Sequence, residues 1–316
     1  MSEQVREQPA PRTPVARLIG VLMSPGETFA EISRNPAWLA PFIIYMVVFL
    51  VAFGVYAMKA DWISIVTEQI ESSPFMKMVP DANHDQAIAK ATEGMRKLSR
   101  AQLAATQLIN IGSSIVVFFH LLAILFSSLF VMVGSLKDLK LGRAWGRFLL
   151  CLLVFIGYLC VYGIATFAFR DSPGSLLLLT GTAAIVMAGC WAWLLNAQAA
   201  RDIEFHRVLS VCTYGSAVLM IGSAALIVVS LVHQGDIQIG ADKIVPSYLG
   251  AVIKPESAVL SALFSSLDVF WIWYFVVLTI GFRIVTKLTT GMAAAMTFLP
   301  WALIVMIKIA WAAVFG

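Results

Sequence analysis

Long uninterrupted apolar stretches constrain this chain more than any other feature. A helix needs roughly 20 apolar residues to cross the ~30 Å hydrocarbon core of a bilayer, where unpaired backbone groups are not tolerated. Seven stretches reach that length: 38–58, 108–134, 148–169, 175–199, 208–232, 259–282 and 292–315. Of the 22 Lys and Arg and 18 Asp and Glu residues, only Asp268 and Lys308 fall within them. The sequence therefore predicts an all-α, polytopic transmembrane helix bundle of about seven spans.

The composition excludes several other classes of protein. Hydrophobic residues make up 60% of the chain and charged residues 13%, whereas about a quarter of the residues in a soluble domain are charged. Disorder requires the opposite composition. The net charge of +4 is small, and no basic run interleaved with aromatic residues occurs, so we expect no nucleic-acid partner. The lipid bilayer is the expected surrounding.

Lysine and arginine residues of short loops indicate the orientation, because cytoplasmic loops carry an excess of them. With a cytoplasmic N-terminus, twelve of these residues lie inside, while the short outer loops hold only Arg170, Lys243 and Lys254. The inner residues are Arg6, Arg12, Arg17, Arg34, Lys137, Lys140, Arg143, Arg147, Arg201, Arg207, Arg283 and Lys287. We therefore expect a multi-pass protein of a cell membrane, with the N-terminus inside and the C-terminus outside.

Three regions are predicted along the chain. Residues 1–14 are polar and contain three prolines, which is typical of a disordered tail. Residues 15–35 are predicted to form interfacial amphipathic helices, and residues 36–316 form the transmembrane domain. Its outer loop, 59–107, is expected to contain helices over 61–71 and 85–107.

Helical periodicity marks the segment before the first span. Val15, Leu18, Ile19 and Leu22 recur at helical spacing beside arginines, as in a helix that lies on an anionic leaflet. The segment has two interpretations. It sets the angle at which the chain enters the first span, or it presents a cytoplasmic docking face to a partner protein.

A second helix is predicted to follow at once. Ser24 is a candidate N-cap, Pro25 suits the first helical position, and Glu27 has the spacing of a capping box. This helix would carry Phe29 and Ile32 on one face. Asn35 and Pro36 repeat the cap-and-proline pattern in front of the first span.

Two charges inside predicted spans need a partner or a purpose, because a charge in hydrocarbon is costly. Asp268 and Lys308 are equidistant from the 283–291 loop, so in an antiparallel hairpin they should face each other. We expect an intramembrane ion pair. It would fix the register of two helices or serve as an ion or proton relay in a transporter. Alternatively, Lys308 reaches outward to the interface and Asp268 faces a water-filled vestibule.

Two parts of the chain resemble bacterial Yip1-domain proteins. The first part, within 15–58, contains the stretch 22–32 and then Asn35-Pro36; the second, within 205–315, contains 205–216, 267–273 and Gly281-Phe282. The residues that carry the resemblance are Ser24, Pro25, Glu27, Phe29, Pro36, Tyr214, Gly215, Asp268, Phe270, Trp273 and Gly281.

The resemblance implies a polytopic helical protein with a cytoplasmic N-terminus, here in a bacterial cytoplasmic membrane. Eukaryotic members are linked to vesicle traffic and to Rab GTPases, but their Asp-Leu-Tyr-Gly-Pro type of signature is missing here. The family usually has five spans, so 148–199 would be an extra hairpin added to a five-span core.

No catalytic or metal-binding motif occurs in the sequence. A His-Glu-x-x-His pair, a Gly-x-Ser-x-Gly elbow, a phosphate-binding Gly-Lys-Ser loop and a Cys-x-x-Cys pair are all missing. We therefore expect no enzyme, no cofactor and no metal. The favoured function is a scaffold or adaptor that organises partner proteins or lipids, and we expect it to form a homo-oligomer. The alternatives are a transporter that uses Asp268 and Lys308, and a lipid-modifying membrane enzyme.

Overall fold

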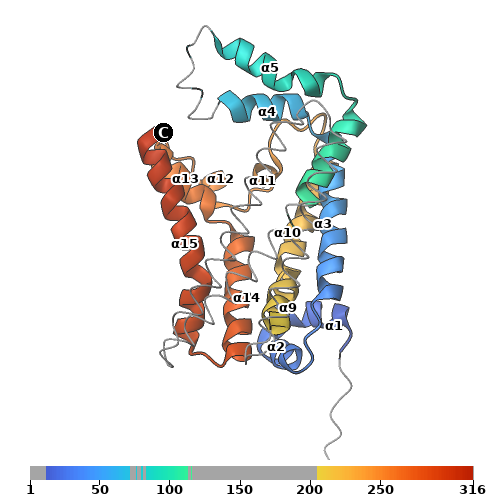
Figure 1. Ribbon diagram of the computed structural model, residues 1–316, viewed down its shortest axis with the longest axis vertical. Coiled ribbons are helices and arrows are strands. Elements are labelled where there is room, and N and C mark those ends of the chain that lie inside the picture. Colours follow the sequence, from blue (N-terminus) through green and yellow to red (C-terminus); the bar gives the residue numbers. More distant parts are fainter. Residues whose placement is uncertain are drawn as a thin grey trace, which may run out of the picture.

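Upright apolar helices dominate the computed structural model, which describes residues 12–71, 83–112 and 205–315 and the single residues 76, 80 and 115. Four helices in these ranges are long and apolar enough to cross a membrane. They are α3 (Leu39–Lys59), the nearly continuous α9 (Phe205–Gly215) and α10 (Ala217–Val232), α14 (Val269–Thr286) and α15 (Thr290–Phe315). Figure 1 shows them side by side.

Three of these helices lie where the sequence predicts spans, at 38–58, 208–232 and 292–315. The predicted spans 148–169 and 175–199 lie outside the described residues, as does 108–134 except for its first residues, which belong to a helix over 100–112. The number of about seven spans therefore stays a prediction.

The predicted span 259–282 is divided in the structure. Helix α13 (Ala258–Ser266) ends before Leu267, and α14 begins after Asp268. The Asp268 side chain accepts hydrogen bonds from the backbone amides of Phe270 and Trp271, at 2.9 and 3.1 Å. A side chain that caps free amides starts a new helix. The membrane-spanning helix is therefore 269–286, and α13 instead packs against α15.

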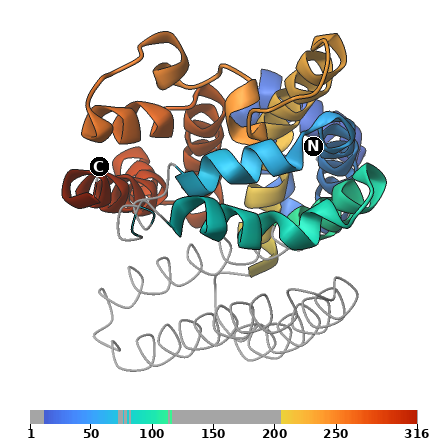
Figure 2. The same ribbon diagram turned by 90° about the horizontal axis from the view of Figure 1, so that it is seen from above.

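Short helices cover the two ends of the bundle. Helices α1 (Pro14–Met23) and α2 (Pro25–Arg34) lie at one end, while α4 (Trp62–Glu71) and α5 (His84–Arg96) run across the other (Figures 1 and 2). The predicted helix 85–107 is broken at Lys97–Ser99. There Ser99 and Gln102 form a capping box, with the Ser99 amide donating to Gln102 Oε1 at 2.8 Å.

The α4–α5 end is tied to the segment that follows α10. Ile237 pairs with the backbone on both sides of Ala60 through hydrogen bonds of 2.8 and 2.9 Å. The Lys59 ammonium group donates to the carbonyls of Ser230 and His233, at 2.8 and 2.7 Å, and so closes the C-terminus of α10. Together with α11 (Ala241–Ile244), this region buries Tyr56 and Trp62 in one apolar core. The second core lies at the α1–α2 end.

Candidate functional site

Several of the residues that carry the family resemblance, which we call the family-like residues, lie in or against α1 and α2. We call these two helices the α1–α2 hairpin (residues 14–34). Helix α1 begins after Thr13, whose side chain accepts from the Ala16 amide at 3.3 Å. It ends where the Ser24 amide donates to the Gly20 carbonyl at 2.7 Å. Pro25 then starts α2, as its fixed backbone angle favours.

The predicted capping box at Ser24 and Glu27 is not formed, although α2 begins where the sequence predicts. The Ser24 side chain makes no capping hydrogen bond. Its amide already closes α1, so it is not free to receive the Glu27 carboxylate. Helices α1 and α2 instead pack closely on either side of the turn. A Cβ at Gly20 of α1 would stand 2.6 Å from Thr28 Oγ1 of α2. Asn35 likewise ends α2 rather than starting α3.

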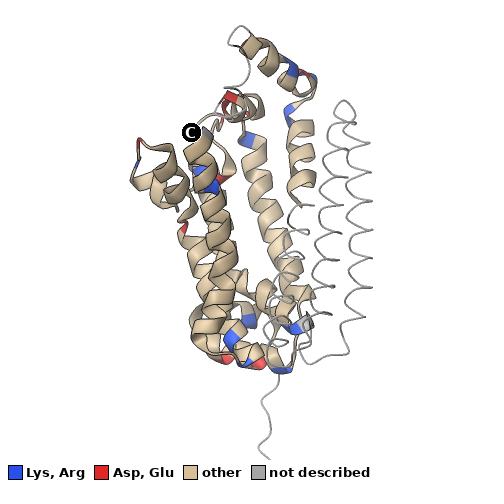
Figure 3. Cartoon of the chain, turned by 60° about the vertical axis from the view of Figure 1, so that its left-hand side comes forward, with Lys and Arg blue, Asp and Glu red and all other residues tan. Residues whose placement is uncertain are grey.

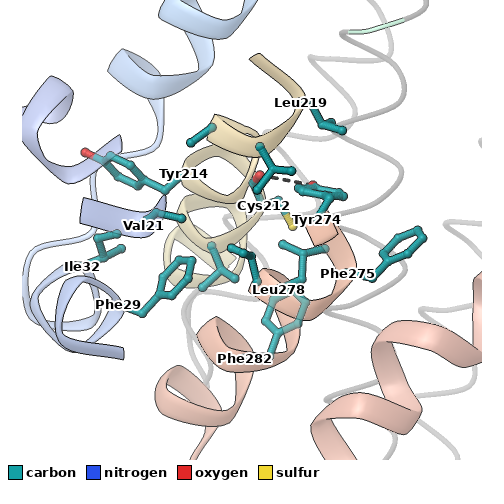
Figure 4. Close-up of a cluster of buried hydrophobic side chains, with 14 of the residues drawn as sticks. Val21, Phe29, Ile32, Cys212, Tyr214, Leu219, Tyr274, Phe275, Leu278 and Phe282 are labelled. Atoms are coloured by element: carbon teal, nitrogen blue, oxygen red, sulfur yellow. Dashed lines mark hydrogen bonds between the residues drawn. The ribbon is translucent and has the colours of Figure 1, made fainter. Parts of the chain in front are cut away.

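The inner face of the hairpin is packed against α9 and α14. Val21, Phe29 and Ile32 are fully buried, and Figure 4 shows them directed toward the side chains of α9 and α14. Phe29 reaches Gly281 of α14, where an added Cβ would lie 3.1 Å from the Phe29 ring and 2.6 Å from Val211 Cγ1. Glycine is therefore required at 281, because three elements meet there without room for a side chain.

A partly buried charge pair joins α1 to α2. The Arg17 side chain is only 5% exposed, and its Nε donates to Glu31 Oε1 at 3.0 Å. Its Nη1 donates to the Asn35 carbonyl at 3.0 Å, and the Arg12 amide adds a 2.8 Å bond to Glu31. Partial burial raises the pKa of Glu31, but these hydrogen bonds and the two arginine charges outweigh burial and lower it below 4.5. Glu31 is therefore held ionised.

Two tyrosines of the motif-bearing helices line the same core. Tyr214 is fully buried. Its hydroxyl lies near the Arg17 side chain but has no hydrogen-bond partner of good geometry. Tyr274 of α14 donates to the Cys212 carbonyl at 3.2 Å, the dashed line in Figure 4. Gly215 lets these helices approach, because a Cβ there would stand 3.0 Å from the side chain of Leu278.

The structure thus brings some of the predicted residues together and separates others. Phe29, Tyr214, Gly215 and Gly281 meet in the core at the α1–α2 end. Glu27 is exposed on α2, and Pro36 lies in the connection to α3. Asp268, Phe270 and Trp273 belong to the opposite end of α14, where Phe270 packs against Gly222.

Sequence reasoning missed Arg17 and Glu31 as a pair. A usable signal existed, since Arg17 shares the buried face of α1 with Leu18 and Val21. An arginine on the buried face of a helix needs a carboxylate or carbonyl partner nearby. Nothing in the sequence, however, indicates which acidic residue supplies it.

The expected Asp268–Lys308 ion pair does not occur among the ion pairs of the described residues. Asp268 instead caps α14 and accepts from the Ser247 hydroxyl, on a segment that pairs with it as a short antiparallel bridge. Lys308 is exposed on α15. An antiparallel pairing of Asp268 with Lys308 requires one continuous helix over 259–282, whereas a new helix starts at Asp268.

Over the same ranges, no three His, Cys, Asp or Glu side chains are placed to hold a metal ion. The inward side chains of the α1–α2 hairpin pack in the core, and Glu31 pairs with both Arg12 and Arg17. The α1–α2 hairpin is thus packed tightly against the bundle and presents its outer side as a fixed surface at one end. The exposed part of that surface includes Gly26, Glu27 and Arg34 of α2.

Comparison with known proteins gives one match. The family model described as the Yip1 domain matches residues 136–312, more than half of the chain. The match extends over 148–199, which the sequence predicts to be an addition to the core, and does not include 15–58. No curated protein and no solved structure matches the chain.

Proposed function

Because the chain belongs to the Yip1-domain family, we propose that this multi-pass membrane protein is a non-enzymatic scaffold or adaptor. It organises partner proteins at the cytoplasmic face through the α1–α2 hairpin. The family generally consists of non-catalytic membrane proteins. The observation that carries the proposal is the fixation of the hairpin by the Phe29–Gly281 contact and the Arg17–Glu31 pair.

A fixed surface favours recognition because little conformational entropy is lost when a partner binds. The outward residues of α2 are polar, with Glu27 and Arg34 exposed. The apolar residues Phe29 and Ile32 are buried in the core. A polar, preorganised face of this kind suits a water-soluble protein or the soluble part of a membrane protein. Transport is not proposed, because the charge pair on which it depended is not formed.

Photo-crosslinking in native membranes tests the proposal. A crosslinking amino acid is placed at Glu27 or Arg34 of the full-length protein, and at exposed Glu93 of α5 as the control. We expect one discrete protein adduct that both α2 positions share and that Glu93 does not give. The combined charge reversal Glu27→Lys with Arg34→Glu should abolish capture from a third position, Gly26.

The result that overturns the proposal is equally specific. If Gly26, Glu27 and Arg34 give no discrete adduct, or the same adducts as Glu93, the hairpin is not a docking surface. An adduct whose mass is that of two copies of this chain would replace the adaptor with self-assembly. Accessibility of a tag near residue 27 from the cytoplasmic side checks the orientation in the same membranes.

A further inference from the structure

The outer side of α1 is apolar, in contrast to that of α2. Val15, Ile19 and Met23 are 55%, 55% and 79% exposed, and their spacing of four residues places them on one face of the helix. The opposite face holds Arg17, Leu18 and Val21, which are buried. Helix α1 therefore has two apolar faces, and the packing of the protein uses only one of them. We call Val15, Ile19 and Met23 the α1 stripe.

The contacts of α1 locate the stripe within the bundle. Helix α1 contacts α3, α9 and also α10, and it lies beside α9 in Figure 1. Ala217, where α10 starts, follows Arg207, the first residue of the apolar span, by ten residues, about 15 Å of helix. Helix α1 lies at the end of the bundle and reaches the start of α10, so it borders the end of a helix that is long enough to cross a membrane. A free apolar face at this place suits the boundary between headgroups and acyl chains.

Basic side chains gather at the same end of the bundle. Arg34 of α2 and Arg283 and Lys287 of the end of α14 are exposed, and Figure 3 shows basic residues at this end. We call these three residues the basic rim. The nearby Glu31 is already bonded to Arg12 and Arg17, which leaves Glu27 as the other acidic residue of the hairpin. Among the described residues of the hairpin and the end of α14, positive charge therefore remains in excess.

We propose that the α1–α2 end binds anionic phospholipids: the α1 stripe inserts among the acyl chains of one leaflet, and the basic rim binds the headgroup phosphates. An apolar helix face beside a basic surface is the combination that anchors interfacial helices to anionic membranes. Exposed Lys and Arg residues near such a surface attract anionic headgroups. This inference goes beyond the adaptor function and does not depend on a protein partner.

The first part of the test locates the stripe. The full-length protein carries a photo-crosslinking amino acid at Ile19, or at Glu27 as the matched control, and is reconstituted into vesicles of phosphatidylglycerol and phosphatidylcholine. Both positions are exposed, so neither substitution disturbs the core. We expect lipid adducts at Ile19 to exceed those at Glu27 on the order of tenfold. Equal yields at the two positions would overturn the insertion of α1.

The second part measures the charge preference. Phosphatidylglycerol retained by the purified protein is compared between the wild type and the variant Arg34→Gln, Arg283→Gln, Lys287→Gln. The control neutralises three exposed basic residues of the other end: Lys90, Arg96 and Lys254. We expect the rim variant to lose at least about fivefold of its preference over phosphatidylcholine, while the control keeps it. An unchanged preference, or the same loss in both variants, would refute binding at the rim. Protein crosslinks at Gly26 are scored separately, so the adaptor proposal stands or fails on its own.

Discussion

Phe29 lies so close to Gly281 that a Cβ added to the glycine would stand 3.1 Å from the phenylalanine ring. The two residues are more than 250 positions apart in the chain, on α2 and α14. Their contact joins the N-terminal hairpin to a membrane-spanning helix. The contact explains why phenylalanine and glycine occur at these two family-like positions: they pack against each other, and neither is needed to bind a ligand.

Replacing Gly281 with alanine should destabilise the protein by about 1–3 kcal/mol, because the new Cβ would lie 2.6 Å from Val211 Cγ1 and force the helices apart. Thermal unfolding in detergent measures the change. Gly94→Ala is the control, since nothing lies within 4 Å of that site in α5. It should be neutral or stabilising by up to about 1 kcal/mol. Equal shifts in the two variants would contradict the close contact.

Removing one partner of the Arg17–Glu31 pair should be costly, because Arg17 is almost fully buried. We expect Arg17→Met to destabilise the protein by about 1–3 kcal/mol, and a double-mutant cycle with Glu31→Gln to show a coupling above about 0.5 kcal/mol. The exposed pair Glu93–Lys97 is the comparison and should show at most about 0.5 kcal/mol. Additive losses at Arg17 and Glu31 would show that the pair contributes nothing.

Acid should loosen the α1–α2 hairpin. The pKa of Glu31 is lower in the folded protein than its ordinary 4.5, so its stabilising contribution is fully present above that pH. The contribution is lost as the pH falls through the folded pKa. Hydrogen exchange of the α1 and α2 amides should therefore accelerate as the pH drops below 4.5, after correction for the intrinsic rate. In Glu31→Gln this additional acceleration should disappear; if it persists, another group is responsible.

Asp268 should behave as a helix cap and not as the partner of Lys308. We expect Asp268→Ala to cost about 1 kcal/mol and Asp268→Asn less, because asparagine also caps helices. Lys308→Met combined with Asp268→Asn should be additive within about 0.5 kcal/mol, as measured by unfolding in detergent. A larger favourable coupling would restore the ion pair that the sequence suggested.

Lys59 should stabilise the junction between α3 and α10. Lys59→Met removes hydrogen bonds to the carbonyls of Ser230 and His233, and we expect a loss of about 1.5–3 kcal/mol. Exposed Lys254 provides the matched control, and Lys254→Met should change stability by less than about 0.5 kcal/mol. If both lysines give the same small effect, the cap on α10 is not significant.

Much of the helical arrangement follows from local patterns. The apolar stretches 38–58, 208–232 and 292–315 coincide closely with α3, with α9 and α10, and with α15. Pro25 begins α2 as the sequence predicts, since the restriction on its backbone acts at the residue itself. The burial of Phe29 and Ile32 also agrees with their expected common face.

The candidate site was less accessible to sequence reasoning. Hydropathy is averaged over a window, so one charged residue at 268 does not interrupt an apolar stretch. The sequence therefore predicts a single span where the structure has α13 and α14. The partner of an N-cap or of a buried arginine depends on neighbouring groups in space. Asp268 turned out to accept from amides two and three residues away, and Arg17 to bond to Glu31 on the next helix.

The sequence by itself determined that this chain is a membrane bundle and where several of its helices begin, because bilayer thickness and proline geometry act on short stretches of chain. Only the tertiary structure decided which residues form the α1–α2 end. The Phe29–Gly281 contact depends on how closely α2 and α14 cross. The exposure of the α1 stripe depends on which face of α1 the bundle covers, and helical periodicity alone does not choose between the two faces.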